Sequence, residues 1–351
     1  LLQKIISKNL DKDLNLNLNS YALSATQFIY DSNFAHVHGA FIKNKKRGAE
    51  NSISETFNIK LDADLLNTPQ FVTNHITKQK EITVQDIHNN LYLISNKGKV
   101  LWKKQLKGAV LGTIEQIDMY KNGRLQFAFA TPNHIYVLDR KGSTVSPFPL
   151  RFNDEITQPL SVFDYDKNKK YRLLVTQGKN VLLYDAKGQI VKGFTFKAAN
   201  DAIISQPKHF RIGSKDYLAL KTKSKLYILD RTGKTRVTPK TESSFSNEPI
   251  FLYQKKFTTT SPTGKLVSID TRGNTSAVNL NLSQNHNLET TSKTRVTLQD
   301  NKLRIKSRVL ELDYGNYSRP RIFYINNKIY VSVTDLQANK VHLYDSQGQA
   351  I

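Results

Sequence analysis

One short pattern recurs along the chain, and its spacing constrains the fold more than any other feature. Each copy is an apolar run containing Tyr or Leu, followed by Asp or Ser, two turn residues and Gly. Clear copies lie at 91–98, 135–142, 181–188 and 226–233, weaker copies at 266–273 and 341–348, and a degenerate copy at 303–312. The turn glycines Gly98, Gly142, Gly188, Gly233 and Gly273 are separated by 44, 46, 45 and 40 residues. A period of about 40–45 residues is typical of β-propeller blades.

Strand and turn signals within each unit support this interpretation. Runs such as 125–130, 171–175 and 217–221 have strand length and are rich in β-forming residues. Asp three residues before Gly suits a tight hairpin in which the carboxylate binds the backbone and Gly takes a positive φ. Several units also begin at a proline, which the first residue of a strand tolerates: Pro69, Pro159, Pro207, Pro249 and Pro320. The sequence therefore predicts an all-β fold with a propeller of seven four-stranded blades, or eight in a longer chain.

The chain divides into two predicted domains. Residues 1–54 are interpreted as the tail of an upstream α+β domain plus a basic linker, because 1–12 has helical apolar spacing and 28–42 contains strand-like runs. Residues 55–351 form the propeller, which we expect to be truncated at its C-terminus. The segment 56–61 resembles an outer strand. We expect it to pair with the C-terminal unit and close the ring, or else to complete an eighth blade.

Composition narrows the classes of function. The chain has no cysteine, which excludes disulfides and thiolate metal sites. No run of 18 apolar residues is present, so this sequence holds no predicted membrane-spanning helix. The 52 Lys and Arg exceed the 29 Asp and Glu, and the net charge of +23 favours anionic partners. Because the lysines are scattered over turns, a solvated surface is favoured over a dedicated nucleic-acid site.

No catalytic constellation stands out, and we predict no enzymatic activity, no cofactor and no metal site. The sequence has no evident Ser-His-Asp set and no phosphate loop. Asp164 and Asp166 alternate as in calcium-binding loops, but neighbouring lysines oppose a cation, so a simple β-turn is favoured. His36 and His38 share one face of a predicted strand without an identifiable third ligand.

The repeats resemble those of a known family. The apolar-Tyr/Leu pattern, the Asp-x-x-Gly turn and Trp102 after Gly98 are similar to the blades of quinoprotein-like (PQQ-like) propellers. That group includes the outer-membrane assembly scaffold lipoprotein of the β-barrel machinery. Residues 70–104 and 173–196 resemble more closely the C-terminal propeller of an uncharacterised bacterial envelope family, sometimes labelled ribonuclease HII. The residues do not support that label, because such an enzyme holds two Mg²⁺ ions with clustered carboxylates in an α/β fold.

The resemblance implies a location in the bacterial cell envelope, in the periplasm or at the outer membrane. Quinone dehydrogenases of similar fold stack their cofactor on a Trp. Trp102 is the one Trp of this chain, and its position within the repeat predicts that it packs neighbouring blades instead.

The sequence thus predicts a non-catalytic protein-interaction scaffold of a cell-envelope complex, with an acidic or envelope-associated protein partner. Propeller loops sit on rigid ring faces and can form such a binding surface. Lys97, Arg140, Lys187 and Arg231 occupy the same turn position or its neighbour and would form a partner-binding arc. Two alternatives remain open: a basic protein that binds nucleic acid or another anionic polymer, and an enzyme with a site in the central channel.

Overall fold

The structure, a computed structural model, describes residues 21–31, 34–43, 57–338 and 340–351. Every regular element in these ranges is a β-strand. The chain divides into two compact units, Leu1–Asn58 and Ile59–Ile351, a few residues beyond the predicted boundary at 54. In the first unit, β1 (Tyr21–Asp31) and β2 (Phe34–Lys43) form an antiparallel hairpin that contains the predicted strands. The helix predicted over 1–12 lies outside the described residues.

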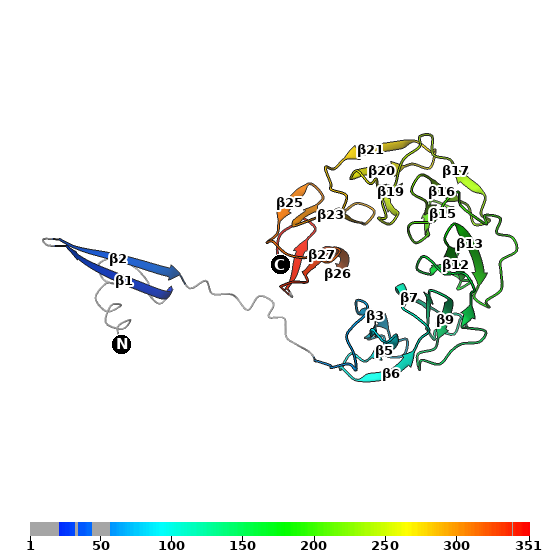
Figure 1. The fold of residues 1–351 in the computed structure, drawn as a ribbon, viewed down its shortest axis with the longest axis horizontal. Helices are drawn as coiled ribbons and strands as arrows, with labels where there is room; N and C mark the ends of the chain where they lie inside the picture. The colour runs from blue at the N-terminus through cyan, green and yellow to red at the C-terminus, as the bar shows by residue number, and fades with distance from the viewer. Residues whose placement is uncertain (1–20, 32–33, 44–56, 339) are drawn as a thin grey trace. The chain divides into compact units, whose positions relative to one another are not determined.

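The second unit is a β-propeller of seven antiparallel blades in a ring (Figure 1). Blade 1 contains β3 (Gln70–Thr73), β4 (Lys80–Gln85), β5 (Asn90–Ile94) and β6 (Val100–Gln105). Blade 2 contains β7 (Leu111–Ile117), β8 (Gln126–Thr131), β9 (His134–Leu138) and β10 (Leu150–Arg151). Blade 3 contains β11 (Ser161–Phe163), β12 (Arg172–Gln177) and β13 (Asn180–Asp185).

The remaining four blades follow the same order along the chain. Blade 4 contains β14 (Lys208–Ile212), β15 (Lys215–Lys221), β16 (Leu226–Leu229) and β17 (Thr235–Val237). Blade 5 contains β18 (Phe251–Tyr253), β19 (Lys256–Thr260), β20 (Lys265–Ile269) and β21 (Thr275–Asn279). Blade 6 contains β22 (Asn287–Thr290), β23 (Arg295–Gln299), β24 (Lys302–Ile305) and β25 (Arg308–Glu311). Blade 7 contains β26 (Arg321–Ile325), β27 (Lys328–Asp335) and β28 (Lys340–Asp345).

The seven-bladed propeller is confirmed, but the prediction of four strands in every blade is wrong for blades 3 and 7, which have three. In blade 3 the outer position is reduced to isolated bridges, Tyr184 to Ile190 and Asn180 to Ala198. A turn, closed by the bond from Phe194 N–H to the Val191 carbonyl, interrupts the segment between them. A single bridge, Tyr344 to Ala350, marks the outer position of blade 7.

Apolar side chains between neighbouring blades form the core of the ring. Strands β8 and β9 are buried along their whole length, because both of their faces contact another blade. Between blades 4 and 5, for example, Phe257 of β19 packs against Phe210 and Tyr217, with ring centroids 5.9 and 5.2 Å apart. Six of the seven junctions hold an apolar cluster shared by two blades. At these six junctions, the apolar face of one blade is therefore covered by the apolar face of the next blade.

The strand expected to close the ring does not form in the described residues. Residues 57–61 have no strand partner, so the predicted pairing with the C-terminal unit is wrong. Ile59 and Leu61 instead pack on Val84, Tyr92 and Ile94, on the face of blade 1 that blade 2 does not cover. The free energy gained by covering that apolar face explains the position of the segment.

The Asp-x-x-Gly turns have the predicted geometry. Asp139 Oδ1 accepts hydrogen bonds from the N–H groups of Lys141 (2.8 Å) and Ser143 (2.9 Å), and Gly142 has φ 81°. A Cβ at Gly142 would lie 2.9 Å from the Trp102 ring, so this position needs glycine for both backbone and packing reasons. Equivalent carboxylate bonds close the turns that begin at Asp185, Asp230, Asp270 and Asp345.

Side chains next to the strand-initiating prolines join the blades near the centre of the ring. Gln158 Nε2 donates to the Ile203 carbonyl of the next blade (3.0 Å), and Gln206 Nε2 donates to the Leu160 carbonyl of the preceding blade (2.8 Å). Gln70 exchanges two such bonds with the backbone of Ile114. These bonds satisfy backbone groups in the inner strand β7 and in the segments that precede the inner strands β11 and β14.

Replacement of Phe257 by alanine should strongly destabilise the ring, because the fully buried side chain joins two blades. We expect a loss of about 3–5 kcal/mol in the free energy of unfolding, measured by urea denaturation. Phe71, which is 71% exposed on β3, provides a matched control whose replacement should change that free energy by less than about 0.5 kcal/mol. Similar losses for both variants would contradict the packing described here.

Candidate functional site

Successive turns of each blade lie alternately on the two faces of the ring. We call the first face the turn face: it carries the first and third turns of each blade, 74–79 and 95–99 in blade 1 and their equivalents. The second is the connection face: it carries the middle turns and the segments between blades, 86–89 and 106–110 at blade 1 and their equivalents. All four residues of the predicted arc lie on the turn face, on blades 1 to 4.

The four arc residues do not share one environment. Lys97 and Lys187 are exposed at the tips of their turns, and neither side chain forms an ion pair with another residue in the described ranges. Arg140 and Arg231 are partly buried and bind carboxylates of this chain. Two of the four cations are therefore directed to solvent, and two contribute to the structure of the ring.

Arg140 joins blade 2 to blade 1. Its guanidinium forms an ion pair with Glu81 of β4, which is 4% exposed. Trp102 Nε1 donates a 2.8 Å hydrogen bond to the Arg140 carbonyl, and its ring lies 6.2 Å from that of Phe127. Trp102 thus packs one blade against the turn of the next, as its position in the repeat predicted.

Arg231 of blade 4 binds one carboxylate of blade 3, Asp166, and one of its own blade, Asp216. Its Nη2 lies 2.6 Å from Asp166 Oδ1, and its Nε lies 2.5 Å from Asp216 Oδ2. The hydrogen bond from Arg231 holds the pKa of Asp166 below its usual range. The guanidinium also lies over the Tyr165 ring, 5.0 Å from its centroid. This network is a structural contact between blades.

The carboxylates of the loop 164–168, which resembles a calcium-binding loop in sequence, bind groups of this chain instead. Asp164 accepts hydrogen bonds from the N–H groups of Asn168 (3.1 Å) and Lys169 (2.9 Å) and so closes its own turn, whereas Asp166 binds Arg231. The Lys169 ammonium forms an ion pair with Asp118 of blade 2. Among the described residues, no group of three or more His, Cys, Asp or Glu side chains could hold a metal ion.

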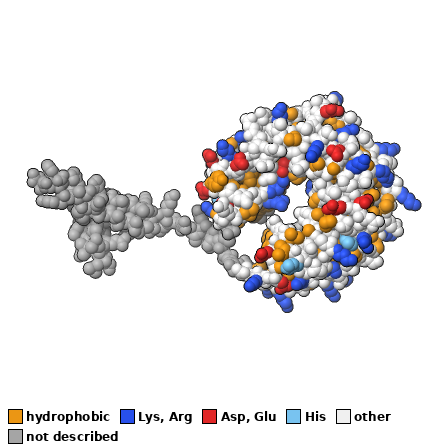
Figure 2. Space-filling view, in the orientation of Figure 1, with side chains coloured by type: hydrophobic (Ala, Val, Ile, Leu, Met, Phe, Trp, Pro, Cys, Tyr) orange, Lys and Arg blue, Asp and Glu red, His pale blue; other side chains and the backbone are white. Residues whose placement is uncertain are grey.

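Charge is distributed unequally between the two faces. The first and third turns of blades 1 to 6 expose a cation in each blade, and Figure 2 shows Lys and Arg side chains along the circumference of the ring. These exposed turn-face cations are Lys78, Lys97, Lys99, Lys121, Arg124, Lys141, Lys167, Lys170, Lys187, Lys234, Lys255, Arg272 and Lys293. The connection face exposes fewer cations, among them Lys107, Lys179, Lys223 and Lys225, and it also exposes carboxylates, namely Asp64, Asp154, Glu155, Asp201, Glu242, Asp300 and Asp313, whereas the turn face exposes Asp166. The positive charge of the protein is thus concentrated on the turn face.

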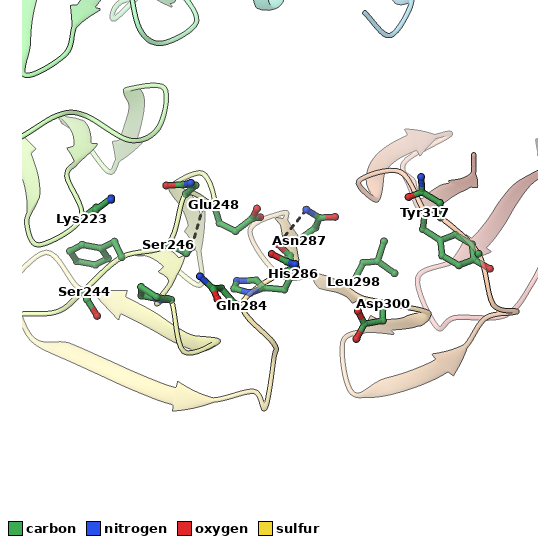
Figure 3. Close-up of a pocket in the computed structure, with 16 residues that line it drawn as sticks. Lys223, Ser244, Ser246, Glu248, Gln284, His286, Asn287, Leu298, Asp300 and Tyr317 are labelled. Atoms are coloured by element: carbon green, nitrogen blue, oxygen red, sulfur yellow. Dashed lines mark hydrogen bonds between the residues drawn. The ribbon is translucent and has the colours of Figure 1, made fainter. Parts of the chain in front are cut away.

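The connection face contains a pocket of about 840 Å³, a volume within the range of about 300–1,000 Å³ that ligand sites occupy. Figure 3 shows its lining, which comes from corresponding loops of blades 4 to 7. Phe245, His286 and Leu298 are buried beneath it, and polar side chains surround it. No sequence motif marked this site, because its residues come from loops that differ between repeats.

A buried lysine holds one wall of this pocket in place. Lys221, at the end of β15, is fully buried. Its Nζ donates to the Ser246 carbonyl (2.7 Å), to the Glu248 carbonyl and to Thr259 Oγ1 (2.9 Å). Burial lowers the pKa of Lys221 to about 7, while the nearby Glu248 carboxylate acts in the opposite direction. With all three bonds made within the core, Lys221 anchors the segment 244–248 of blade 5 to blade 4.

The Glu248 side chain extends this bonding toward blades 6 and 7. Its Oε2 accepts hydrogen bonds from Leu288 N–H (2.5 Å) and from Arg319 Nη2 (2.6 Å). Arg319 also donates to the Leu288 carbonyl. The walls of the pocket are therefore connected to four blades by buried or partly buried polar contacts. One signal in the sequence was that Glu248 and Arg319 both precede strand-initiating prolines.

Comparisons with known proteins identify the fold and no family. No family model matches the chain, and no curated protein matches it. Within the described residues there is no helix that is long and apolar enough to cross a membrane.

Several solved structures have a similar fold. BBS1N, in its complex with ARL6DN, is 11% identical with a TM-score of 0.56, covering 80% of this chain and 92% of that one. BamB from Moraxella catarrhalis is 15% identical with a TM-score of 0.51, covering 75% and 78%. The Dos1 propeller is 11% identical with a TM-score of 0.55, covering 81% and 82%. At these identities the likeness shows that the chain shares the β-propeller fold, and nothing more specific.

The anchoring role of Lys221 predicts a pH-dependent stability. An unfolded lysine has a pKa of 10.5, whereas the folded value is about 7. Between these pH values the unfolded chain holds a proton that the folded protein lacks, so the free energy of unfolding should rise with pH. Lys221→Met should remove this contribution, as measured by urea denaturation across that interval. The exposed Lys223→Met is the matched control. Identical pH profiles for the wild type and Lys221→Met would contradict the prediction.

Proposed function

We propose that this protein is a non-catalytic scaffold whose turn face binds an acidic protein partner. The observation that carries this proposal is the unequal charge of the two faces. Exposed cations lie on the turns of blades 1 to 6, and the hydrogen bonds of Asp-x-x-Gly turns fix those on the third turns of blades 2 to 5. A surface of one charge sign attracts a partner of the opposite sign over long range and orients it before contact.

Within this surface, the predicted arc contributes through Lys97 and Lys187. Both side chains are exposed, so binding a carboxylate would not require breaking an existing ion pair. Arg140 and Arg231 would support the arc indirectly, because they connect the turns of neighbouring blades. The four residues then have two roles: two contact the partner and two hold the surface in shape.

Other proteins of this fold support an interaction role. BBS1N, a propeller of similar architecture, forms a complex with ARL6DN. The assignment to the quinoprotein-like propellers, and to a bacterial envelope complex, rests on the resemblance of the repeats. The similar fold of BamB is compatible with that assignment.

Site-specific photo-cross-linking tests the binding surface. The full-length protein, with a photoreactive residue at position 97 or 187, is irradiated in the cells that produce it. We expect both positions to capture the same acidic protein. Lys179, exposed on the connection face, is the control position and should not capture it. Capture of nucleic acid at positions 97 and 187, or no reproducible product, would contradict the proposal.

Charge reversal separates the two roles within the arc. The double variant Lys97→Glu and Lys187→Glu should weaken capture of the partner severalfold and leave the melting temperature unchanged, because both side chains are exposed. Arg231→Glu should instead lower the free energy of unfolding by at least about 1 kcal/mol, because it places a third carboxylate beside Asp166 and Asp216. Equal melting temperatures for the two variants would contradict this division.

A further inference from the structure

The pocket on the connection face has opposite charges at its two ends. Figure 3 shows Lys223, from the turn between β15 and β16, at one end. Asp300, from the turn between β23 and β24, lies toward the other end, beside Tyr317. Both charged residues are exposed, and neither side chain has an ion-pair or hydrogen-bond partner among the residues that the structure describes.

Amide side chains also line this pocket. Asn247, Gln284, Asn285 and Asn316 line the pocket and are exposed. Their side-chain amides form no hydrogen bond within the described ranges of the chain. Each carries two N–H donors and one carbonyl acceptor, which is the complement that a peptide backbone requires. Several such groups around one pocket can bind an extended chain whatever its side chains are, as strand-addition sites do with main-chain groups.

The floor beneath the amides is already fixed by the fold. His286 Nδ1 donates to the Ser283 carbonyl (2.7 Å), and His286 Nε2 lies 2.7 Å from Thr260 Oγ1. The Glu248 carboxylate is held by Leu288 N–H and Arg319. Since the floor groups are satisfied and the rim groups are not, a ligand would bind to the rim without disrupting the core. A preformed site of this kind loses little conformational entropy on binding.

We propose that this pocket binds an extended peptide with an acidic side chain at one end and a basic side chain at the other. The acidic side chain binds Lys223, the basic side chain binds Asp300, and the amides bind the backbone between them. This site lies on the face opposite the turn face and goes beyond the scaffold function proposed above.

Charge variants combined with three sets of peptides test the proposal. Capped synthetic peptides carry Asp and Lys, two Lys or two Asp at their ends, with Ser and Gln between at varied spacing. Binding to the full chain is measured by titration calorimetry. The wild type should prefer the Asp/Lys peptides, Lys223→Glu should prefer the Lys/Lys peptides, and Asp300→Lys should prefer the Asp/Asp peptides. Each switch should change the affinity ratio about tenfold.

A control variant separates local contacts from the net charge of the protein. Lys179→Glu changes the charge of the same face in blade 3, outside the pocket, and should keep the wild-type preference. Near-ultraviolet circular dichroism of each variant checks that the ring is intact. Because no turn-face residue is altered, failure here would leave the turn-face tests unaffected.

Three outcomes would overturn the proposal. The first is the absence of binding by every peptide set up to millimolar concentration. The second is a preference that changes equally in Lys179→Glu and Lys223→Glu, since this would show an effect of net charge alone. The third is binding of neutral oligosaccharides in place of peptides, which would assign the amide-lined pocket to a different class of ligand.

Discussion

The architecture of this protein depends on blades that are apolar on both faces. A sheet such as that of blade 2, in which every residue of β8 and β9 is buried, cannot be stable alone in water. Each blade needs a neighbour on both sides, and a ring of twisted sheets meets this need. The apolar clusters shared by neighbouring blades fix the angle between blades. They thereby fix the position of every loop on both faces.

Charged side chains contribute to this framework as well as to the surface. Arg140, Arg231 and Arg319 each reach a carboxylate of another blade, and Lys221 bonds to two carbonyl groups of the next blade. Removal of one member would leave the other buried without its partner, which usually costs more than the pair contributes. The net charge of +23 therefore overstates how many cations are available to a partner. The available cations are those at the tips of the turns.

The two faces differ in how closely their loops follow the sequence repeat. On the turn face, the third turns of blades 2 to 5 share the Asp-x-x-Gly element, so their cations recur at similar positions. The connection face is built from segments such as 239–249 and 280–286, which vary in length and composition between blades. The pocket lies where these variable segments meet. A repeat protein can thus present a regular charged surface on one face, and on the other face a binding site that occurs once because its loops differ between blades.

The sequence by itself determined the blade number, the turn geometry and the role of Trp102, because each follows from a local pattern repeated at a constant period. All four arc residues occupy equivalent or neighbouring positions in the third turns of their blades. The sequence nevertheless could not predict that Arg140 and Arg231 bind carboxylates while Lys97 and Lys187 remain exposed. Residues that meet across a blade junction, such as Arg231 and Asp166, are 65 positions apart, and no local pattern records that distance. The outer segment 57–61, the three-stranded blades and the pocket were likewise decided by tertiary structure. Their form depends on which apolar faces and polar groups remain uncovered once the ring has assembled.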